Sequence, residues 1–249
     1  MLFSTCNCPT GSAGVSRRDL ICGGGAGFVT ALTSTLAGSG RIARAQPLRP
    51  RVPEVDRLAV TIVTDTQLIK FIPTEKRNGL TIERRPAGNV RPDAPPRFDL
   101  VAEWGLSMHA QSQKGSDVRN VLIDFGYTPE TLNNNFSVLQ LDPGKIDALV
   151  LSHGHYDHFG GLVGFLGANK GKLKRRLPFF VGGEDCFCTR ETPAGQYGSL
   201  DRQAILDADL SLMLAEGTAV VADHAFTTGK IPEASFEKPL RPSSGKSAS

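Results

Sequence analysis

The sequence predicts one globular domain of the α+β class, and three observations support this prediction. Apolar, β-branched runs that are typical of strands occur at residues 58–64, 118–124 and 149–151. Signals that start helices lie between such runs, the clearest being Thr128-Pro129-Glu130. The chain has 249 residues, of which 40% are hydrophobic, so it is long enough to build one core.

The first 45 residues predict an export signal that precedes this domain. Ser16-Arg17-Arg18 opens a mildly apolar, glycine-rich run from Cys22 to Gly38, and Ala43-Arg44-Ala45 then has the small-x-small pattern of a cleavage site. This order is typical of a twin-arginine (Tat) signal cut after Ala45. We therefore expect a periplasmic or secreted protein with no stable membrane span after signal cleavage. A cytoplasmic amphipathic or disordered leader is the alternative.

The charge balance excludes a typical nucleic-acid-binding protein. Lys and Arg number 28 and Asp and Glu number 25, which gives a net charge of +3 at pH 7. Residues 1–45 hold four arginines and one aspartate, so the rest of the chain is neutral overall. A neutral domain lacks the electrostatic attraction to phosphates that nucleic-acid binding requires. We expect a small-molecule substrate instead.

The mature chain is predicted to begin with a linker, a core strand and a long loop. Residues 46–57 are rich in proline and arginine, which is typical of a linker. Residues 58–64 are β-branched and apolar, and we expect them to form the first core strand. Residues 73–96 contain five prolines, so an irregular loop is expected there.

Two strands and a helix are expected next. The strand-like runs at 98–112 and 118–124 flank a turn at Gly115. Thr128-Pro129-Glu130 then provides a hydroxyl cap, a proline at the first helical position and an acidic first turn. The helix that follows presents a buried stripe made of Leu132, Phe136 and Leu139.

The remaining patterns are shorter. In order, they predict a strand ending at Leu151, a helix at 159–166, a strand at 177–181, a loop at 182–199, a helix at 201–210 and a strand at 217–222.

The stretch from Leu149 to Leu162 carries the strongest functional signal. His153, His155, Asp157 and His158 lie within six residues, between an apolar strand and Gly160-Gly161. Residues two apart on an extended segment point the same way, so His153 and His155 can bind one cation, and Asp157 and His158 can reach a second. We predict a site for one or two zinc ions, with Asp157 also a candidate catalytic carboxylate. A histidine-rich surface loop and a structural zinc site are the alternatives.

The pattern His-x-His-x-Asp-His after a hydrophobic strand resembles the metallo-β-lactamase superfamily. One subgroup, often labelled 7,8-dihydropterin-6-yl-methyl-4-(β-D-ribofuranosyl)aminobenzene 5'-phosphate synthase, has successive landmarks similar to residues 102–107, 121–126, 151–162 and 227–232. The resemblance implies an αββα four-layer sandwich over residues 58–239 and a dinuclear, hydrolase-like metal site. It also implies that Asp124 orients the metal loop and that Tyr156 supports it. Trp104 departs from the subgroup, where a histidine is expected in Glu-His-Gly-Leu-Ser.

The resemblance further implies later ligands that the chain does not supply in the expected form. Two later histidines and a bridging residue are expected, but residues 240–249 form a polar tail without histidine. His224 is a possible additional ligand, with a surface or supporting histidine as the alternative. We therefore expect the sandwich to be incomplete at the C-terminus, through truncation or loss of its second half. The apolar faces left exposed would favour self-association.

Two functions follow from these expectations. The first is an exported metal-dependent hydrolase that uses a zinc-bound hydroxide on an ester, lactone, amide or phosphoester. The second is a truncated, catalytically incompetent fragment that binds metal or a partner. A β-lactamase proper is a further possibility, although no residue pattern specifies a β-lactam pocket.

Three smaller features allow two or more interpretations. Cys186 and Cys188 fit packing residues, a soft metal ligand or a reactive pair. His109 fits a packed or surface residue rather than a ligand. The basic run at 170–176 fits a solvated turn or a rim that attracts an anionic substrate.

Overall fold

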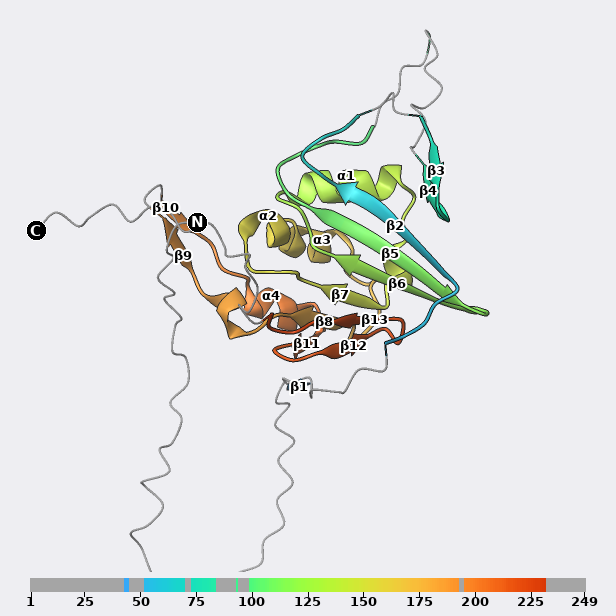
Figure 1. Ribbon diagram of the computed structural model, residues 1–249. Coiled ribbons are helices and arrows are strands. Elements are labelled where there is room, and N and C mark those ends of the chain that lie inside the picture. Colours follow the sequence, from blue (N-terminus) through green and yellow to red (C-terminus); the bar gives the residue numbers. More distant parts are fainter. Residues whose placement is uncertain are drawn as a thin grey trace, which may run out of the picture.

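The centre of the molecule is a seven-stranded mixed sheet with the strand order β1-β11-β8-β7-β6-β5-β2 (Figure 1). The computed structural model describes residues 43–44, 52–69, 73–83, 93, 99–192 and 195–231. The sheet strands are β1 Ala43–Arg44, β2 Arg57–Thr64, β5 Ser107–Lys114, β6 Asp117–Ile123, β7 Ala148–Val150, β8 Pro178–Val181 and β11 Ser211–Leu214. Strands β2, β5 and β6 are antiparallel neighbours, whereas β6, β7, β8, β11 and β1 run parallel. The carboxyl ends of the parallel strands therefore share one edge of the sheet.

Helices cover one face of this sheet. They are α1 Pro129–Val138, α2 Tyr156–Phe159, α3 Leu162–Ala168 and α4 Arg202–Asp207, with short 3₁₀ helices at Pro143–Lys145 and Glu184–Phe187. Leu122, Leu149 and Phe179 point from the strands into the core on this side, where they meet residues of α1 and α3. Phe136 of α1 and Phe165 of α3 pack with ring centroids 4.9 Å apart.

A hairpin covers part of the opposite face. It consists of β12 Ala219–Val221 and β13 Ala225–Thr227. Successive strand residues point to opposite faces of a sheet. The neighbours of the helix-side core residues therefore point toward this hairpin and form a second cluster with it, made of Val121, Ala148 and Phe180 from the sheet. The central strands are therefore buried on both faces.

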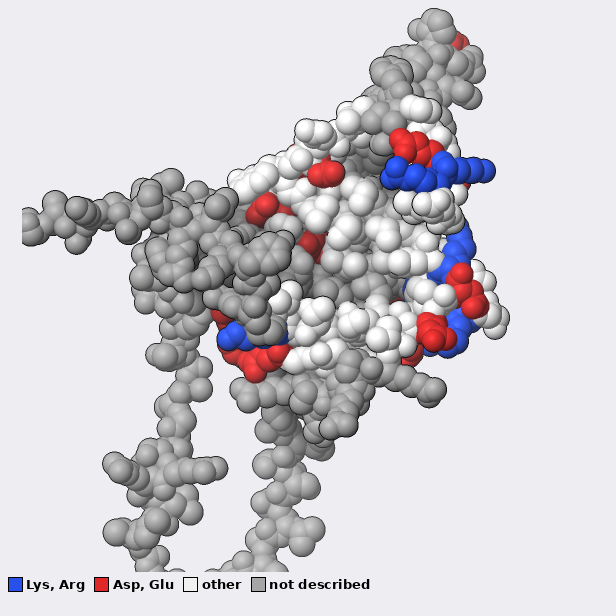
Figure 2. Space-filling model, viewed as in Figure 1, with Lys and Arg blue, Asp and Glu red and all other residues white. Residues whose placement is uncertain are grey.

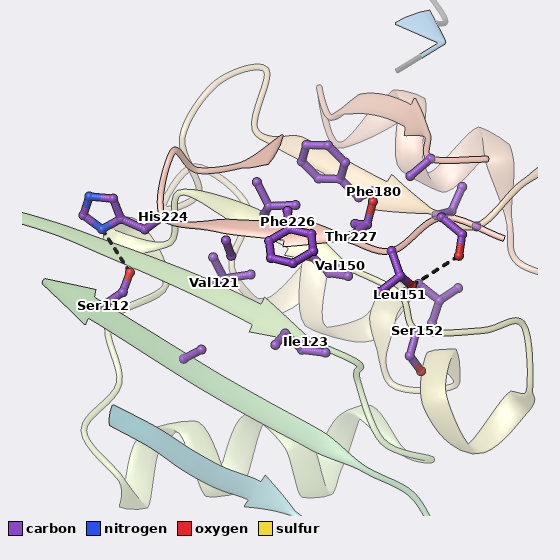
Figure 3. Close-up of a pocket in the computed structure, with 18 of the residues that line it drawn as sticks. Ser112, Val121, Ile123, Val150, Leu151, Ser152, Phe180, His224, Phe226 and Thr227 are labelled. Atoms are coloured by element: carbon purple, nitrogen blue, oxygen red, sulfur yellow. Dashed lines mark hydrogen bonds between the residues drawn. The ribbon is translucent and has the colours of Figure 1, made fainter. Parts of the chain in front are cut away.

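The rest of this second face is open to solvent. Leu58, Val60 and Ile62 of β2 lie on it with exposed fractions of 60%, 52% and 49%. A groove of about 530 Å³ runs between β2 and the β12–β13 hairpin, and apolar side chains line most of it (Figure 3). In Figure 2, few charged side chains lie over the middle of the viewed face. The predicted self-association through this face stays a prediction.

Several predicted elements are confirmed. Strand β2 coincides with the predicted 58–64, β6 with 118–124 and β8 with 177–181. The helix predicted after Thr128-Pro129-Glu130 is α1, where the Thr128 side chain accepts a hydrogen bond from Thr131 N. An α+β fold of the predicted type is confirmed, and local caps and apolar runs are sufficient to place these elements.

Other predicted elements were wrong in extent. The helix expected at 159–166 is instead the end of α2 and most of α3, which are separated at Gly160-Gly161. Residue 161 has no room for a side chain, because a Cβ atom there would lie 2.2 Å from Phe125 O. The strand expected over 98–112 begins only at Ser107. Hairpins occupy parts of the two expected loops: β3 Glu75–Arg77 with β4 Leu80–Ile82, and β9 Arg190–Thr192 with β10 Gly195–Tyr197.

The predicted four layers are partly present in the described residues. These residues form one helix layer and one large sheet, and the second sheet is represented there by the β12–β13 hairpin. The expected tail and most of the expected signal and linker lie outside the described residues. Within the described part of the chain, no helix has the length and apolar character needed to span a membrane.

Two glycines of α3 provide a test of its packing. A Cβ atom on Gly164 would lie 2.3 Å from Pro129 Cβ of α1, whereas one on Gly167 would meet nothing within 4 Å. We expect Gly164→Ala to lower the free energy of unfolding by about 1–3 kcal/mol through overpacking. The matched control Gly167→Ala should raise it by about 0.5–1 kcal/mol, because alanine favours a helix. Urea unfolding measures both, and equal effects would contradict the α1–α3 contact.

Candidate metal centre

The histidine loop, residues Ser152–His158, leaves the carboxyl end of β7. Strand β7 lies between β6 and β8, so the loop sits where the carboxyl ends of three parallel strands meet. Ligand sites of parallel sheets are found at this edge. Neighbouring backbone holds the loop: Leu106 N donates to Asp157 O at 3.2 Å, and Phe125 N donates to His158 O at 2.7 Å.

The structure brings the four predicted ligands together. Nε2 of His153 lies 2.9 Å from Nδ1 of His155, and the ring centroids of His153 and His158 are 4.1 Å apart. Nε2 of His158 lies 3.5 Å from Oδ2 of Asp157. Three imidazoles and a carboxylate therefore occupy one small volume at the surface.

Asp124 lies beneath this loop and is fully buried. Its Oδ1 accepts a hydrogen bond from Ser152 N at 2.7 Å, and its Oδ2 accepts one from Ser152 Oγ at 2.7 Å. Oδ2 also lies 2.7 Å from Nδ1 of His158. Asp124 thus ties the start of the loop to its end, which is the orienting role that the resemblance implies. A carboxylate on one imidazole nitrogen leaves the other nitrogen free to bind a metal.

Ser152 is a site residue that the sequence reasoning missed. Besides its bonds to Asp124, its Oγ lies 3.0 Å from Nδ1 of His153. Its position directly before the first histidine could have indicated this role, because serine side chains often form hydrogen bonds with neighbouring loop groups.

The environment of His153 favours its neutral form. Desolvation within the loop is the main cause that lowers the pKa of this imidazole, followed by the nearby imidazoles of His158 and His155. Asp124 and Asp157 act in the opposite direction. Neutral imidazole is the form that binds metals.

Tyr156 supports the loop through ring contacts. Its ring lies 5.2 Å from that of Tyr127 and 5.3 Å from that of Phe159, centroid to centroid. Phe159 is a core residue with 6% of its surface exposed, so this contact anchors the loop to the core.

His224 does not reach the histidine loop, so the predicted additional ligand was wrong. It lies in the β12–β13 turn, where Nδ1 is 3.1 Å from Ser112 Oγ and Nε2 is 3.4 Å from Asp117 Oδ2. Asp117 begins β6, and the histidine loop lies beyond the other end of the parallel strands. Figure 3 accordingly places His224 and Ser152 at opposite ends of the groove.

The other open features also lie away from the loop or in the core. The basic run precedes β8, at the edge of the sheet opposite the histidine loop, and Lys174 in it bonds to Asp147 at 2.5 Å. Its proposed role as a rim is therefore wrong. Cys186 and Cys188 are buried, each with 3% of its surface exposed. Burial fits a packing role for Cys186, whereas Cys188 forms a disulfide bond, a role that the sequence did not predict. His109 is buried in β5, and desolvation lowers its pKa against the effect of a hydrogen bond with Asn120.

The donor types in the histidine loop suit a zinc ion, while their arrangement suits it only in part. Within the described residues, no three His, Cys, Asp or Glu side chains converge as a metal-binding group. Nε2 of His153 and Nδ1 of His155 lie 2.9 Å apart, within hydrogen-bonding distance, so both rings would have to turn slightly to bind the same ion. Asp157 and His158 would have to turn toward the same point.

Comparisons with known proteins find three similarities. Residues 116–175 match the model of the metallo-beta-lactamase superfamily. The chain is 29% identical over 80 residues to a 7,8-dihydropterin-6-methyl-4-(beta-D-ribofuranosyl)-aminobenzene-5'-phosphate synthase of Methanocaldococcus jannaschii, a match that covers 32% of this chain and 26% of that protein. The chain thus matches about a quarter of that relative's length. A crystal structure from Thermotoga maritima, assigned to the metallo-beta-lactamases, shares 18% identity over 51% of this chain and 44% of its own, with a TM-score of 0.25.

Proposed function

We propose, from the premise that this chain belongs to the metallo-beta-lactamase superfamily, that it is a zinc-dependent hydrolase of a small molecule. One observation supports this above all: three imidazoles and the Asp157 carboxylate lie in pairwise contact at the carboxyl edge of β7, with the buried Asp124 bonded behind His158. Pairing a carboxylate with a ligating histidine is common at zinc sites. The matching relative is named a synthase, so the ester, lactone, amide or phosphoester specificity is part of the proposal.

The residues at this site would have two roles: some would bind the metal, and others would keep the metal ligands in place. His153 and His155 would bind one ion, and Asp157 and His158 would bind a second or complete the first. A bound zinc ion supplies a Lewis acid and lowers the pKa of its water ligand. Asp124 would keep the His158 ring in place, because its carboxylate binds Nδ1 and leaves Nε2 facing Asp157. Asp157, in contact with that nitrogen, is the carboxylate best placed to accept a proton during the reaction.

The proposal also includes export of the protein through the Tat pathway. Residues 16–45 carry the twin-arginine pattern and the small-x-small pattern described above, which support a periplasmic or secreted protein. Tat substrates cross the membrane folded, so a metal site could be loaded before export. Fractionation of cells that produce the full chain, beside an Arg17→Lys/Arg18→Lys variant, tests this localisation.

A second candidate is a protein that binds metal or a partner without hydrolysing a substrate. It is favoured by the partial convergence of the donors in the histidine loop and by the open apolar face with Leu58 and Val60. The two candidates predict different responses of activity, so one experiment can distinguish them.

Zinc binding by the purified chain tests the metal site itself, and it is read by calorimetry and by elemental analysis after gel filtration. We expect the wild-type chain to retain at least one zinc ion and the His153→Ala/His155→Ala variant to retain none, because two imidazole ligands are removed. His224→Ala is the matched control and should bind like the wild type. Equal retention by all three proteins would overturn the assignment of the site.

Activity then separates the candidates. Hydrolysis of a panel of esters, lactones, amides and phosphoesters should be lost with chelator and restored by zinc. Hydrolysis that is insensitive to chelator would refute the zinc-dependent mechanism, whereas zinc binding without hydrolysis would favour the second candidate.

A further inference from the structure

Four aromatic rings form a row that leads from the core to the surface beside the histidine loop. Phe159 packs against Tyr156 at 5.3 Å, Tyr156 against Tyr127 at 5.2 Å, and Tyr127 against Trp104 at 5.4 Å, all between ring centroids. The row is assembled from three separate segments of the chain. Its inner end, Phe159, is buried, while Trp104 is 57% exposed and Tyr127 is 38% exposed.

The two exposed rings are held in a fixed relation to each other. Oε1 of Glu103 accepts hydrogen bonds from Tyr127 N at 3.1 Å and from Thr128 N at 2.9 Å, and its Oε2 accepts one from Thr128 Oγ1 at 2.6 Å. The residue next to Trp104 is therefore bonded directly to the backbone that carries Tyr127. Trp104 and Tyr127 meet at an interplanar angle of 46°, so they form an open corner rather than a closed stack.

The same segments are packed tightly against the histidine loop. A Cβ atom on Gly105 would lie 2.5 Å from Asp157 O, and one on Gly160 would lie 2.2 Å from Tyr127 O. Leu106 N also donates to Asp157 O. These are contacts between backbones, so the segments that carry the two exposed rings are held against the histidine loop.

We propose that Trp104 and Tyr127 form an aromatic platform that stacks a planar aromatic or heteroaromatic ring of the substrate. Indole and phenol faces attract such rings by stacking, and the Tyr127 hydroxyl offers a polar handle at the edge. The rigid link to Asp157 would place the bound ring beside the loop that acts on the reacting group. This proposal specifies the substrate class of the site and rests on the proposed function for the reaction, but ring binding itself requires neither metal nor turnover.

Trp104 is the only tryptophan of the chain, so its fluorescence reports on the platform directly. The titrations use metal-free protein in chelator with two matched pairs of probes: adenosine against ribose, and benzoate against cyclohexanecarboxylate. We expect saturable quenching by adenosine and benzoate and none by ribose and cyclohexanecarboxylate. The absence of saturable quenching by both planar probes would overturn the proposal, and so would equal binding of cyclohexanecarboxylate and benzoate.

Variants assign the binding to the two rings. Calorimetry should show that Trp104→Leu and Tyr127→Leu each weaken adenosine binding by about 5- to 150-fold, the range of base–aromatic stacking. Trp104→Phe keeps a ring and should restore most of the affinity. Phe226→Leu, which removes an exposed ring from β13, is the matched control and should bind adenosine like the wild type. An effect of Phe226→Leu without one of Trp104→Leu would place the ring elsewhere and contradict the platform.

Zinc binding by the Trp104→Leu variant separates this proposal from the proposed function. The variant should retain as much zinc as the wild type. If neither the wild type nor the variant binds zinc but the wild type still binds adenosine, the zinc-dependent hydrolase is refuted and the platform is retained. If both proteins bind zinc but the wild type does not bind adenosine, only the platform is refuted.

Discussion

Asp124→Ala is expected to lower the free energy of unfolding by about 3–5 kcal/mol, because it removes one partner from a buried, charged hydrogen-bond network. The carboxylate accepts bonds from Ser152 N and Ser152 Oγ and contacts Nδ1 of His158. Without it, these three loop groups lose their buried partner. Urea unfolding measures the loss, and zinc affinity should fall in the same variant, by about 10- to 100-fold, because His158 is no longer oriented.

Backbone conformation contributes to this loss and can be controlled. Asp124 has a φ of 59°, a left-handed value at which alanine is strained. Asp209 has a φ of 55° and forms only an exposed ion pair with Arg175, which contributes little, so Asp209→Ala reports mainly the cost of the conformation, about 1–2 kcal/mol. Asp124→Asn should fall between the two, because asparagine tolerates this φ and keeps one acceptor oxygen. If Asp124→Ala costs no more than Asp209→Ala, the carboxylate does not hold the loop.

Gly105→Ala is expected to cost about 2–4 kcal/mol, since it combines backbone strain with a clash. Gly105 has a φ of +136°, and a Cβ atom there would lie 2.5 Å from Asp157 O and 3.0 Å from Tyr127 N. Both neighbours are backbone atoms, so the segment that carries Trp104 has to move away from the histidine loop. Trp104 fluorescence should shift together with the loss of stability.

Gly115→Ala is the matched control for this prediction. Gly115 has a φ of +58° in the β5–β6 turn, and a Cβ atom there would meet nothing within 4 Å. Only the conformational cost remains, about 1 kcal/mol. Similar unfolding midpoints for both variants would show that the segment at Gly105 has room to relax.

The parts of the fold that were predicted correctly are those with signals local to the chain. Helix α1 follows from its cap, its proline and its apolar stripe, and β2 and β6 follow from β-branched runs. The β3–β4 hairpin was missed although Asn78-Gly79, a common two-residue turn, lies at its tip. Prolines elsewhere in that region outweighed this signal. The four residues of β11 are a strand because β8 pairs with them, which no local pattern shows.

The candidate site divides in the same way. His153, His155, Asp157 and His158 are neighbours in sequence, so their spacing alone was sufficient to group them. Asp124 was predicted only through the resemblance, because 28 residues separate it from Ser152. His224 was misplaced since its sequence distance gives no direction, and the β12–β13 turn carries it to the far edge of the sheet.

The open sheet face has a consequence for how the protein responds to temperature and salt. The groove between β2 and β12–β13 is lined, among the described residues, by apolar, small or hydroxyl side chains and His224, without Lys, Arg, Asp or Glu. Contacts through it would therefore gain their free energy from the release of water rather than from charge pairing. Such contacts weaken on cooling and strengthen in sulfate, the opposite of what salt does to ion pairs. Cold, low-salt buffers should accordingly keep this chain dispersed.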